Sequence, residues 1–324
     1  MLTDSRLILF KLIPVLGLLV ISCGTADTGP ELRVAYPSAV DVDDIPSLMA
    51  DQLLVEQGYM VKPTFYAQSE LAIMALARGD ADIMKGGARN VWQAISQGAK
   101  LVTVMEHAAN NWVMLVVSEI KNCKDLQGRR FAQHSEGAMD RALLDAYLLK
   151  ECPGVEPEIL VIPGSANRAF ALLAGEVDAA GVKIPEAVTI EMQAPGRFDI
   201  LSNFALDLPM LKASFVSVNR DFAIRQPEMV KDYIRAALTV HRRIAKDPDL
   251  LIPEFTKWLD LDPMVISSIL EEQFAIDTWD VKGGLDKESI QFSIDFFVQA
   301  GRLTPGLTVE QVADLSYLEQ VLGE

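Results

Sequence analysis

The sequence is poor in the residue types that most often carry out chemistry or bind polyanions. Its 324 residues include three cysteines and three histidines, and 29 Lys and Arg stand against 45 Asp and Glu, for a formal net charge of −16. This deficit of basic residues disfavours binding to nucleic acid and polybasic adhesion to anionic membranes. Half of the residues are apolar and only 23% are charged, which excludes a disordered chain. We therefore expect a folded protein, long enough for two lobes.

The apolar run near the start of the chain is short. Residues 12–21 are too few to cross a bilayer as a stable helix, but they follow Arg6 and Lys11 and have the length of the apolar core of a signal peptide. The run ends in Val20-Ile21-Ser22-Cys23-Gly24. This ending resembles the bacterial lipobox, in which small residues precede a cysteine that is lipid-modified and becomes the new N-terminus.

The N-terminal pattern predicts a signal peptide over residues 1–22, a lipidated linker over residues 23–30 and lipid modification, such as palmitate, at Cys23. The alternative is an uncleaved anchor helix over residues 7–21. The helix-breaking Pro14 argues against that alternative. We expect an extracytoplasmic protein that is held to the membrane by its lipid.

Such a location is oxidising, so the two remaining cysteines could form a disulfide. Cys123 precedes the strand-like residues 129–133, and Cys152 ends the helix-like residues 139–151, which should run back over that strand. Closing a loop of about thirty residues would contribute ~3–4 kcal/mol in the chain-entropy account. The alternative is two free, partly buried thiols.

Strand-like and helix-like segments alternate along much of the chain. Short apolar segments at residues 32–36, 61–66, 81–84 and 101–105 are separated by helix-like segments, and the same alternation recurs over residues 111–182. Alternation of this kind predicts a parallel, doubly wound α/β layer.

Two passages within the alternating region are similar to each other. Residues 75–82 and 172–178 each combine a helix end, a Gly and a small-residue strand with an Asp near its start. We therefore predict two similar α/β lobes. After Pro209 the composition shifts to long amphipathic helices, among them residues 227–246 and 263–274, which we expect to cover the first lobe.

Five features of the chain occur in an order typical of one known family. They are the lipobox, Leu76-Ala77-Arg78-Gly79-Asp80-Ala81-Asp82, Lys124-Asp125-Leu126-Gln127-Gly128-Arg129-Arg130, Leu173-Ala174-Gly175-Glu176-Val177-Asp178-Ala179 with Pro185, and Asn219-Arg220-Asp221-Phe222 before Gln226-Pro227-Glu228. In these features the chain resembles the solute-binding proteins of ABC importers. The similar branch contains binders of aliphatic sulfonates, taurine, nitrate and thiamine-precursor pyrimidines.

The resemblance implies the type II periplasmic-binding-protein fold, with two doubly wound α/β lobes joined by two crossover strands, here near residues 113–118 and 213–218. It implies that lobe 1 consists of residues 31–115 and 216–324 and lobe 2 of residues 116–215. Such a protein is a monomer without a cofactor. It closes around a small solute and presents it to a membrane permease, whose partner ATPase supplies the energy.

In open α/β sheets, ligands lie beyond the carboxyl ends of the strands, where helix N-termini offer N–H groups and partial positive charge. The turns at these positions, and the crossing between the lobes, supply the candidate contacts. They are Ser38, Asp41, Gly87, Arg89, Asn90, Asn111, Trp112, Ser135, Glu136, Gly137, Asn167, Lys183 and Glu186.

Several candidates also have a purely structural interpretation. Arg89 could clamp an anion or point to solvent, and Trp112 could stack on a planar ligand or pack in the hinge. Glu136 could receive a ligand amine or only stabilise a helix start, and Lys183 could be a surface residue. In the acidic cluster at residues 41–44, capping explains one or two carboxylates, and a third could receive a cation.

Two further sets of residues carry simpler expectations. Ser165 and Arg168 at a helix start are interpreted as a cap and a solvated charge. His107 and His134 fall at strand ends in opposite lobes, but they lack the spacing of a zinc motif, so we predict no metal site.

The sequence favours binding over catalysis. It contains no Walker A motif, no Gly-x-Ser-x-Gly motif and no paired Cys and His. The alternatives are an enzyme on the same fold, like a pyrimidine-synthesising relative that carries a clustered Cys and His segment, and a membrane-tethered sensor or structural lipoprotein. Arg89, Lys183 and the helix N-termini favour a small oxyanion such as a sulfonate, taurine or nitrate. Glu136, Asp41 and Trp112 would instead suit a zwitterion or an aromatic amine such as a pyrimidine.

Overall fold

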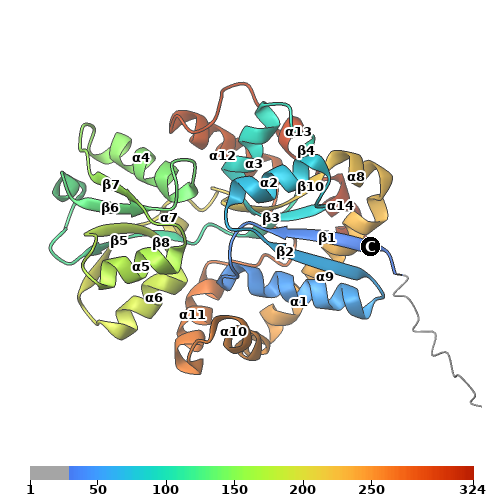
Figure 1. The fold of residues 1–324 in the computed structure, drawn as a ribbon, viewed down its shortest axis with the longest axis horizontal. Coiled ribbons are helices and arrows are strands. Elements are labelled where there is room, and N and C mark those ends of the chain that lie inside the picture. The colour runs from blue at the N-terminus through green and yellow to red at the C-terminus, as the bar shows by residue number, and fades with distance from the viewer. Residues whose placement is uncertain (1–28) are drawn as a thin grey trace, which may run out of the picture.

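The computed structural model describes residues 29–324, which fold into two α/β lobes lying side by side (Figure 1). Residues 1–28, which include the predicted signal peptide and Cys23, lie outside the described residues. Each lobe is built on a five-stranded sheet. The α/β architecture with two similar lobes, predicted from the alternating segments, is confirmed.

The two sheets have equivalent strand orders, β2-β1-β3-β10-β4 in lobe 1 and β7-β6-β8-β5-β9 in lobe 2. The strands of lobe 1 are β1 (Glu31–Tyr36), β2 (Met60–Phe65), β3 (Ile83–Gly87), β4 (Leu101–Ala108) and β10 (Ser214–Asn219). Those of lobe 2 are β5 (Trp112–Val117), β6 (Arg130–Gln133), β7 (Glu158–Val161), β8 (Ala179–Lys183) and β9 (Phe198–Asn203). In each sheet one strand, β10 or β5, is antiparallel to both of its neighbours.

Helices cover the faces of both sheets (Figure 1). Lobe 1 carries α1 (Ile45–Glu56), α2 (Ser69–Arg78) and α3 (Ala88–Ser96), and lobe 2 carries α4 (Met139–Glu151), α5 (Ser165–Leu173), α6 (Ile184–Gln193) and α7 (Phe204–Asp207). The C-terminal helices are α8 (Arg220–Arg225), α9 (Pro227–Lys246), α10 (Ile252–Leu259), α11 (Pro263–Ala275), α12 (Lys287–Gln299), α13 (Val309–Val312) and α14 (Ser316–Leu322). Within residues 29–324, none of these helices has the length and apolarity needed to span a membrane.

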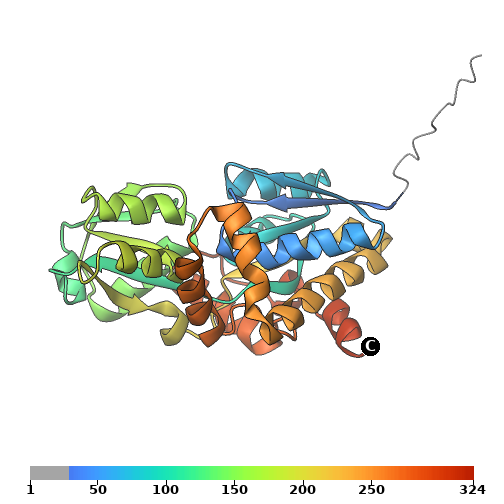
Figure 2. The same cartoon turned by 90° about the horizontal axis from the view of Figure 1, so that it is seen from below.

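Of the C-terminal helices, α9, α10 and α11, coloured gold to orange, lie on the side of the molecule that faces the viewer in Figure 2, whereas α12 and α13 lie at the upper edge of Figure 1. Helix α9 packs on α1 of lobe 1, as expected from its amphipathic pattern. Helix α11 differs from the expectation, because it also packs against α6 of lobe 2. The C-terminal region therefore contacts both lobes.

The chain crosses between the lobes at residues 109–111 and again between β9 and β10. The predicted boundaries, after residue 115 and before residue 216, fall inside β5 and β10. Each of these strands makes its backbone hydrogen bonds within one sheet, β5 in lobe 2 and β10 in lobe 1. The crossings thus precede the two strands, and the predicted boundaries are a few residues late.

The similar passages that were predicted to mark two lobes occupy equivalent positions. Asp82 comes directly before β3 and pairs with Arg33 of β1 at 2.6 Å, and Asp178 comes directly before β8 and pairs with Arg130 of β6 at 2.9 Å. Each Asp also donates its backbone N–H to the carbonyl of its Arg at 2.9 Å. The same ion pair therefore fixes the register of corresponding parallel strands in each lobe.

Some element boundaries differ from the sequence expectation. Strand β3 starts and ends later than the expected segment 81–84, because Gly86 and Gly87 still pair with β10 across the sheet. Helix α6 and strand β9 have no counterpart in the expectation. Strand β9 lies at the sheet edge with two of its six residues exposed, and it lacks the apolar run of a central strand.

A disulfide joins Cys123 and Cys152, whose Cα atoms are 6.1 Å apart. It ties the short helix before β6 to the end of α4, and both cysteines are buried. Both cysteines therefore lie at the same end of the unit formed by β6 and α4.

Replacing both Cys123 and Cys152 with Ser is expected to lower the free energy of unfolding by ~3 kcal/mol, because the loop of 29 residues is no longer closed in the unfolded chain. Urea unfolding of the oxidised wild type and the double variant measures the difference. The reduced wild type should match the variant, and equal midpoints for all three proteins would contradict the expectation.

Candidate functional site

A cavity of about 160 Å³ lies between the two lobes, at the carboxyl ends of the parallel strands. Its walls are the turns that follow β1, β3, β4, β6 and β7, together with Lys183 at the end of β8. The predicted contacts that line it are Ser38, Asp41, Gly87, Arg89, Asn90, Asn111, Trp112, Gly137 and Lys183. Ser135, Glu136, Asn167 and Glu186 do not line it.

Four helices begin at this cavity. Helices α2 and α3 of lobe 1 and α4 and α5 of lobe 2 all contribute residues of their first turn to its wall. None of the four has a side chain at its N-cap that accepts a hydrogen bond from the first turn. Helix N-termini carry partial positive charge and backbone N–H donors, so the cavity is suited to a small anionic or strongly polar group.

The turn at the start of α3 is shaped by one of its two glycines. Gly86 has φ 145°, and a Cβ there would lie 2.7 Å from Pro37 Cγ. Gly87 has an ordinary φ of −54° and open space around its Cα. Only Gly86 therefore requires glycine. Its lack of a side chain lets the turn after β3 pack against the turn after β1.

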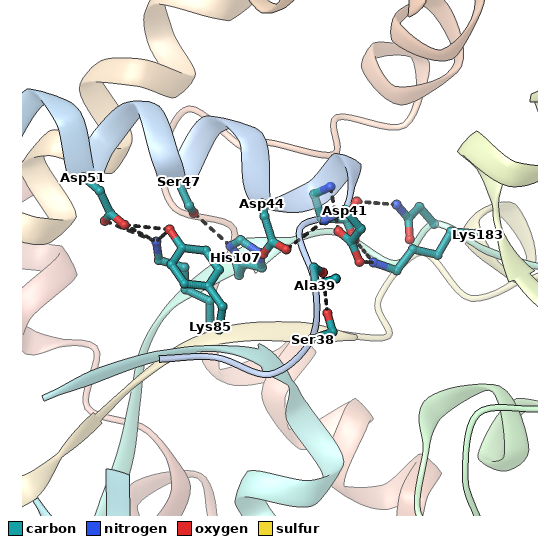
Figure 3. A network of polar contacts seen from close by, with 12 residues as sticks. Ser38, Ala39, Asp41, Asp44, Ser47, Asp51, Lys85, His107 and Lys183 are labelled. Carbon is teal, nitrogen blue, oxygen red and sulfur yellow. Dashed lines mark hydrogen bonds and ion pairs between the residues drawn. The ribbon is translucent and has the colours of Figure 1, made fainter. Parts of the chain in front are cut away.

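Ion pairs hold the acidic cluster of lobe 1 to lobe 2 (Figure 3). Lys183 Nζ lies 2.7 Å from Asp41 Oδ2 and 2.5 Å from Asp43 Oδ2. Asn111 Nδ2 donates to Asp43 Oδ1 at 2.7 Å. Lys183 is thus no surface residue, and its pairs connect the two sides of the cleft.

The electrostatics of this pairing favour the charged state of Lys183. Burial alone would lower the pKa of Lys183, but Asp41 and Asp43 raise it above its usual value. Burial raises the pKa of Asp41 to about 8, although Lys183 opposes the shift. The Asp41 side chain is still 32% exposed and lies 2.7 Å from Lys183 Nζ, which favours the charged pair over a protonated carboxyl.

The third carboxylate of the cluster is held within lobe 1. Asp41 and Asp44 form a reciprocal capping box at the start of the short helix that precedes α1. His107 Nε2 lies 3.2 Å from Asp44 Oδ1, and its Nδ1 lies 3.1 Å from Ser47 Oγ. Burial would raise the pKa of Asp44, but the contact with His107 lowers it. Capping and pairing therefore account for all three carboxylates.

Arg89 does not present a free guanidinium to the cavity. Its Nη1 donates to Gly137 O at 2.8 Å and to Asn90 Oδ1 at 2.8 Å, and its Nε donates to Arg302 O at 2.7 Å. The bond to Gly137 links α3 of lobe 1 with the start of α4 in lobe 2. The side chain therefore bridges the lobes instead of pointing to solvent.

Glu136 lies outside the cavity, at its rim. It pairs with Arg302 at 2.8 Å and with Arg141 at 3.2 Å, and its side chain is 68% exposed. Arg302 also pairs with Asp145. Arg302 follows α12, so this cluster is a second set of ion pairs between lobe 1 and lobe 2.

Arg168 is the clearest correction to the sequence interpretation, because it is fully buried rather than solvated. Its Nε donates to Gly181 O at 2.7 Å and lies 3.3 Å from Asp140 Oδ2. Its guanidinium carbon lies 5.7 Å from the ring centre of Trp112, so Trp112 both packs at the hinge and faces the cavity. The available sequence signal was the position of Arg168, three residues after the start of α5 and on the buried side of that helix.

His134 and Lys85 also line the cavity but were not among the candidates. His134 Nδ1 accepts the N–H of Gly164 at 3.1 Å, and burial lowers the pKa of His134, so the neutral ring carries its proton on Nε2. Lys85 is fully buried beside Asp51 at 3.2 Å. A charged residue inside the apolar strand Ile83-Met84-Lys85 was the available signal for Lys85.

The described residues contain no group of three His, Cys, Asp or Glu side chains arranged to hold a metal ion.

A buried ion pair links the second crossing to strand β4. Lys212, in the crossing before β10, lies 3.1 Å from Glu106 Oε2 on β4. Glu106 Oε1 has no hydrogen-bonding partner among the described residues, and Gly284 packs directly against the carboxylate. Burial raises the pKa of Glu106 to about 7, although Lys212 opposes the shift, while Asp280 and Asp286 add to it.

The pKa of Glu106 predicts a specific pH dependence of stability. A raised folded-state pKa means that the folded protein holds an extra proton above the unfolded pKa, so stability falls as pH rises from about 4.5 to about 7 and is level above that. We expect wild type to lose roughly 2–3 kcal/mol more than Glu106→Gln between about pH 5 and pH 8. Urea unfolding across this range measures it, with the exposed Glu119→Gln as control. Parallel curves for wild type and Glu106→Gln would contradict the assignment.

The fold is similar to that of several solved structures. The periplasmic aliphatic sulphonate binding protein SsuA from Escherichia coli is 19% identical, with a TM-score of 0.70 over 89% of this chain and 92% of that chain. The periplasmic nitrate-binding protein NrtA from Synechocystis PCC 6803 is 12% identical, with a TM-score of 0.70 over 91% and 89%.

A third similar structure is the ligand-binding component of an ABC-type import system from Staphylococcus aureus, with zinc bound. It is 12% identical, with a TM-score of 0.73 over 90% of this chain and 99% of that chain. At these identities the likeness establishes the periplasmic-binding-protein fold, which confirms the predicted fold class. No curated protein matches the sequence.

The sequence itself matches one family description, "NMT1/THI5 like", over residues 54–250, which is more than half of the chain. The matched region runs from α1 through both crossings to the end of α9, so it includes most of the turns around the cavity. The chain belongs to the NMT1/THI5-like family.

Proposed function

We propose that this protein is the extracytoplasmic solute-binding component of an ABC importer and that it holds a small solute in the cavity between its lobes. The observation that carries the proposal is the convergence of α2 and α3 from one lobe with α4 and α5 from the other on a single cavity. A solute there would contact both lobes at once and would stabilise their closed arrangement. The sulfonate-binding, nitrate-binding and import-system proteins of the same fold support this role.

We propose further that the solute carries a small oxyanionic group, as in a sulfonate, taurine or nitrate. Asp41, Asp43 and Asp44 are already paired with Lys183, Asn111 and His107. The uncapped first turns of the four helices and the Nε2 proton of His134 are donors at the cavity wall. An acceptor-rich group satisfies them best.

A second candidate is an aromatic solute such as a thiamine-precursor pyrimidine. Trp112 and the guanidinium of Arg168 give one wall a planar face, and Asp41 and Asp43 could accept a ligand amine if Lys183 moved away. It is the second choice because Lys183 already occupies both carboxylates.

A thermal-shift screen followed by calorimetry separates the candidates. The full chain would be tested with methanesulfonate, taurine, nitrate, sulfate and an aminopyrimidine. We expect the sulfonates to raise the melting temperature and to bind with one-to-one stoichiometry. Binding of the aminopyrimidine alone would favour the second candidate, and turnover of any bound compound would contradict the binding role.

We propose that Cys23 carries the lipid that holds the protein at the membrane, with a permease and its ATPase as partners. In cells that process lipoproteins, Cys23→Ser is expected to move the protein from the membrane fraction to the soluble fraction. The two other cysteines are joined to each other and offer no alternative attachment site. A variant that stays in the membrane fraction would contradict the anchor.

A further inference from the structure

A second and larger hollow lies beside the cavity. It has a volume of about 570 Å³ and is bounded by the turn after β1, by α5 and α6, and by the connection from α10 to α11. Most of the side chains around it are apolar, among them Phe170, Ile190, Leu259, Leu261 and Ile269. We call this hollow the apolar groove and the smaller one the polar cavity.

The apolar groove and the polar cavity share part of their walls. Ser38 and Asp41 of lobe 1 and His134, Gly164 and Ser165 of lobe 2 line both. Helix α11 packs against α6 across the lobes, next to the groove. Both hollows therefore lie in the same cleft and depend on the same closed arrangement of the lobes.

We propose that the apolar groove holds the hydrocarbon body of the solute whose charged head lies in the polar cavity. The inference rests on the proposed function and narrows its solute class to an oxyanion that carries an alkyl or aryl group. The polar cavity alone, at about 160 Å³, is below the range of roughly 300–1,000 Å³ that is usual for ligand pockets, whereas the two hollows together reach it.

The charges around the two hollows fix the orientation of such a solute. Among the described residues that line the apolar groove, none is Lys or Arg, while Asp41 and Glu186 are present. Burial raises the pKa of Glu186, whose carboxylate accepts a hydrogen bond from Ser165 at 2.8 Å. An anionic head would meet no counter-charge in the groove, so it belongs in the polar cavity with the helix N-termini.

Exposed apolar surface supports an apolar occupant. Phe170 on α5 is 56% exposed although it lines the groove, and Leu259 and Leu261 are half-buried. An alkyl chain in the groove would remove this surface from water. The walls come from both lobes, so a solute that enters before closure fits better than a protein segment that docks from outside.

Calorimetry with a homologous series tests the proposal on the full chain. The probes are the linear alkanesulfonates with one, two, four, six and eight carbons. Each buried methylene contributes ~0.8 kcal/mol at most, so affinity is expected to rise about two- to fourfold per carbon until the groove is filled.

Two variants on α5 locate the effect. Ala166 is exposed and lines the groove, so Ala166→Trp should fill it, whereas Ala174 is exposed at the far end of the same helix and does not line it. We expect Ala166→Trp to keep methanesulfonate binding within about threefold and to lose the gain with chain length. Ala174→Trp should behave like wild type.

The outcomes separate the two claims. Binding of methanesulfonate with no gain along the series, or a gain that Ala166→Trp leaves intact, would overturn the groove assignment and leave the proposed function standing. Octanol binding as tightly as octanesulfonate would also overturn it, because the groove would then be independent of the head site. If no sulfonate binds, both the proposed oxyanionic group of the solute and the groove inference that rests on it are wrong.

Discussion

Replacing Lys183 with Met is expected to weaken binding of a sulfonate about a hundredfold and to shift the free protein toward an open cleft. The variant leaves the carboxylates of Asp41 and Asp43 in lobe 1 without the cation that lobe 2 supplies to them across the closed cleft. Removing one partner of a buried ion pair destabilises by roughly 3–5 kcal/mol, and opening the cleft relieves part of this by rehydrating the carboxylates. Closure around the solute must then supply roughly 3 kcal/mol, which corresponds to about two powers of ten in affinity.

Calorimetry and small-angle X-ray scattering measure the two consequences. The control is Lys121→Met, which removes an exposed ion pair of similar length, 2.7 Å to Asp199, within lobe 2 alone. Taurine should lose less affinity than methanesulfonate in Lys183→Met, because its ammonium group can take the place of the lysine. Unchanged affinity and an unchanged radius of gyration in Lys183→Met would show that the pair does not hold the cleft.

Replacing Lys85 with Met is expected to lower the free energy of unfolding by roughly 3–5 kcal/mol. Lys85 and Asp51 are almost fully buried, at 0% and 8% side-chain exposure, and lie 3.2 Å apart. Tyr36 donates to Asp51 Oδ2 at 2.6 Å, and the ammonium lies 4.0 Å from the centre of the Tyr36 ring. Without the lysine, the carboxylate keeps only the phenol as a partner.

A double variant tests whether the loss of stability comes from the unpaired charge of Asp51. Lys85→Met combined with Asp51→Asn should recover at least about half of the loss, since the amide still accepts from Tyr36 and carries no charge. Burial already raises the pKa of Asp51, so the single variant should gain stability as pH falls and Asp51 takes up a proton. The exposed pair of Lys100 and Asp221 is the control, and Lys100→Met should change stability by less than about 1 kcal/mol. A similarly small loss in Lys85→Met would contradict the account.

The fold was largely predictable from the sequence because its signals are local. Helix α9 begins at Pro227 and ends at Lys246, as its apolar period and the proline indicate. Asp82 and Asp178, which precede β3 and β8 and pair with an Arg of the neighbouring strand, explain why two distant passages look alike. Strand β9 was missed because an edge strand with exposed side chains carries no apolar run.

The candidate site was predictable in position but only partly in its residues. Turns after strands in an α/β pattern indicate where a cavity forms, and most of the candidates from those turns do line it. What each charged side chain contacts depends on residues far along the chain, as with Arg302 for Glu136 and Asp41 for Lys183. Arg168 looked solvated because its partner Asp140 lies on a different helix.

The most direct test of the central claim uses Trp112, which lines the polar cavity. A sulfonate identified by calorimetry would be titrated into wild type and Trp112→Phe while tryptophan emission is recorded. The account predicts a saturable emission change in wild type that is lost in Trp112→Phe, although calorimetry still detects binding to that variant. An emission change of the same size in Trp112→Phe, or binding to wild type without any change, would place the solute elsewhere and contradict the account.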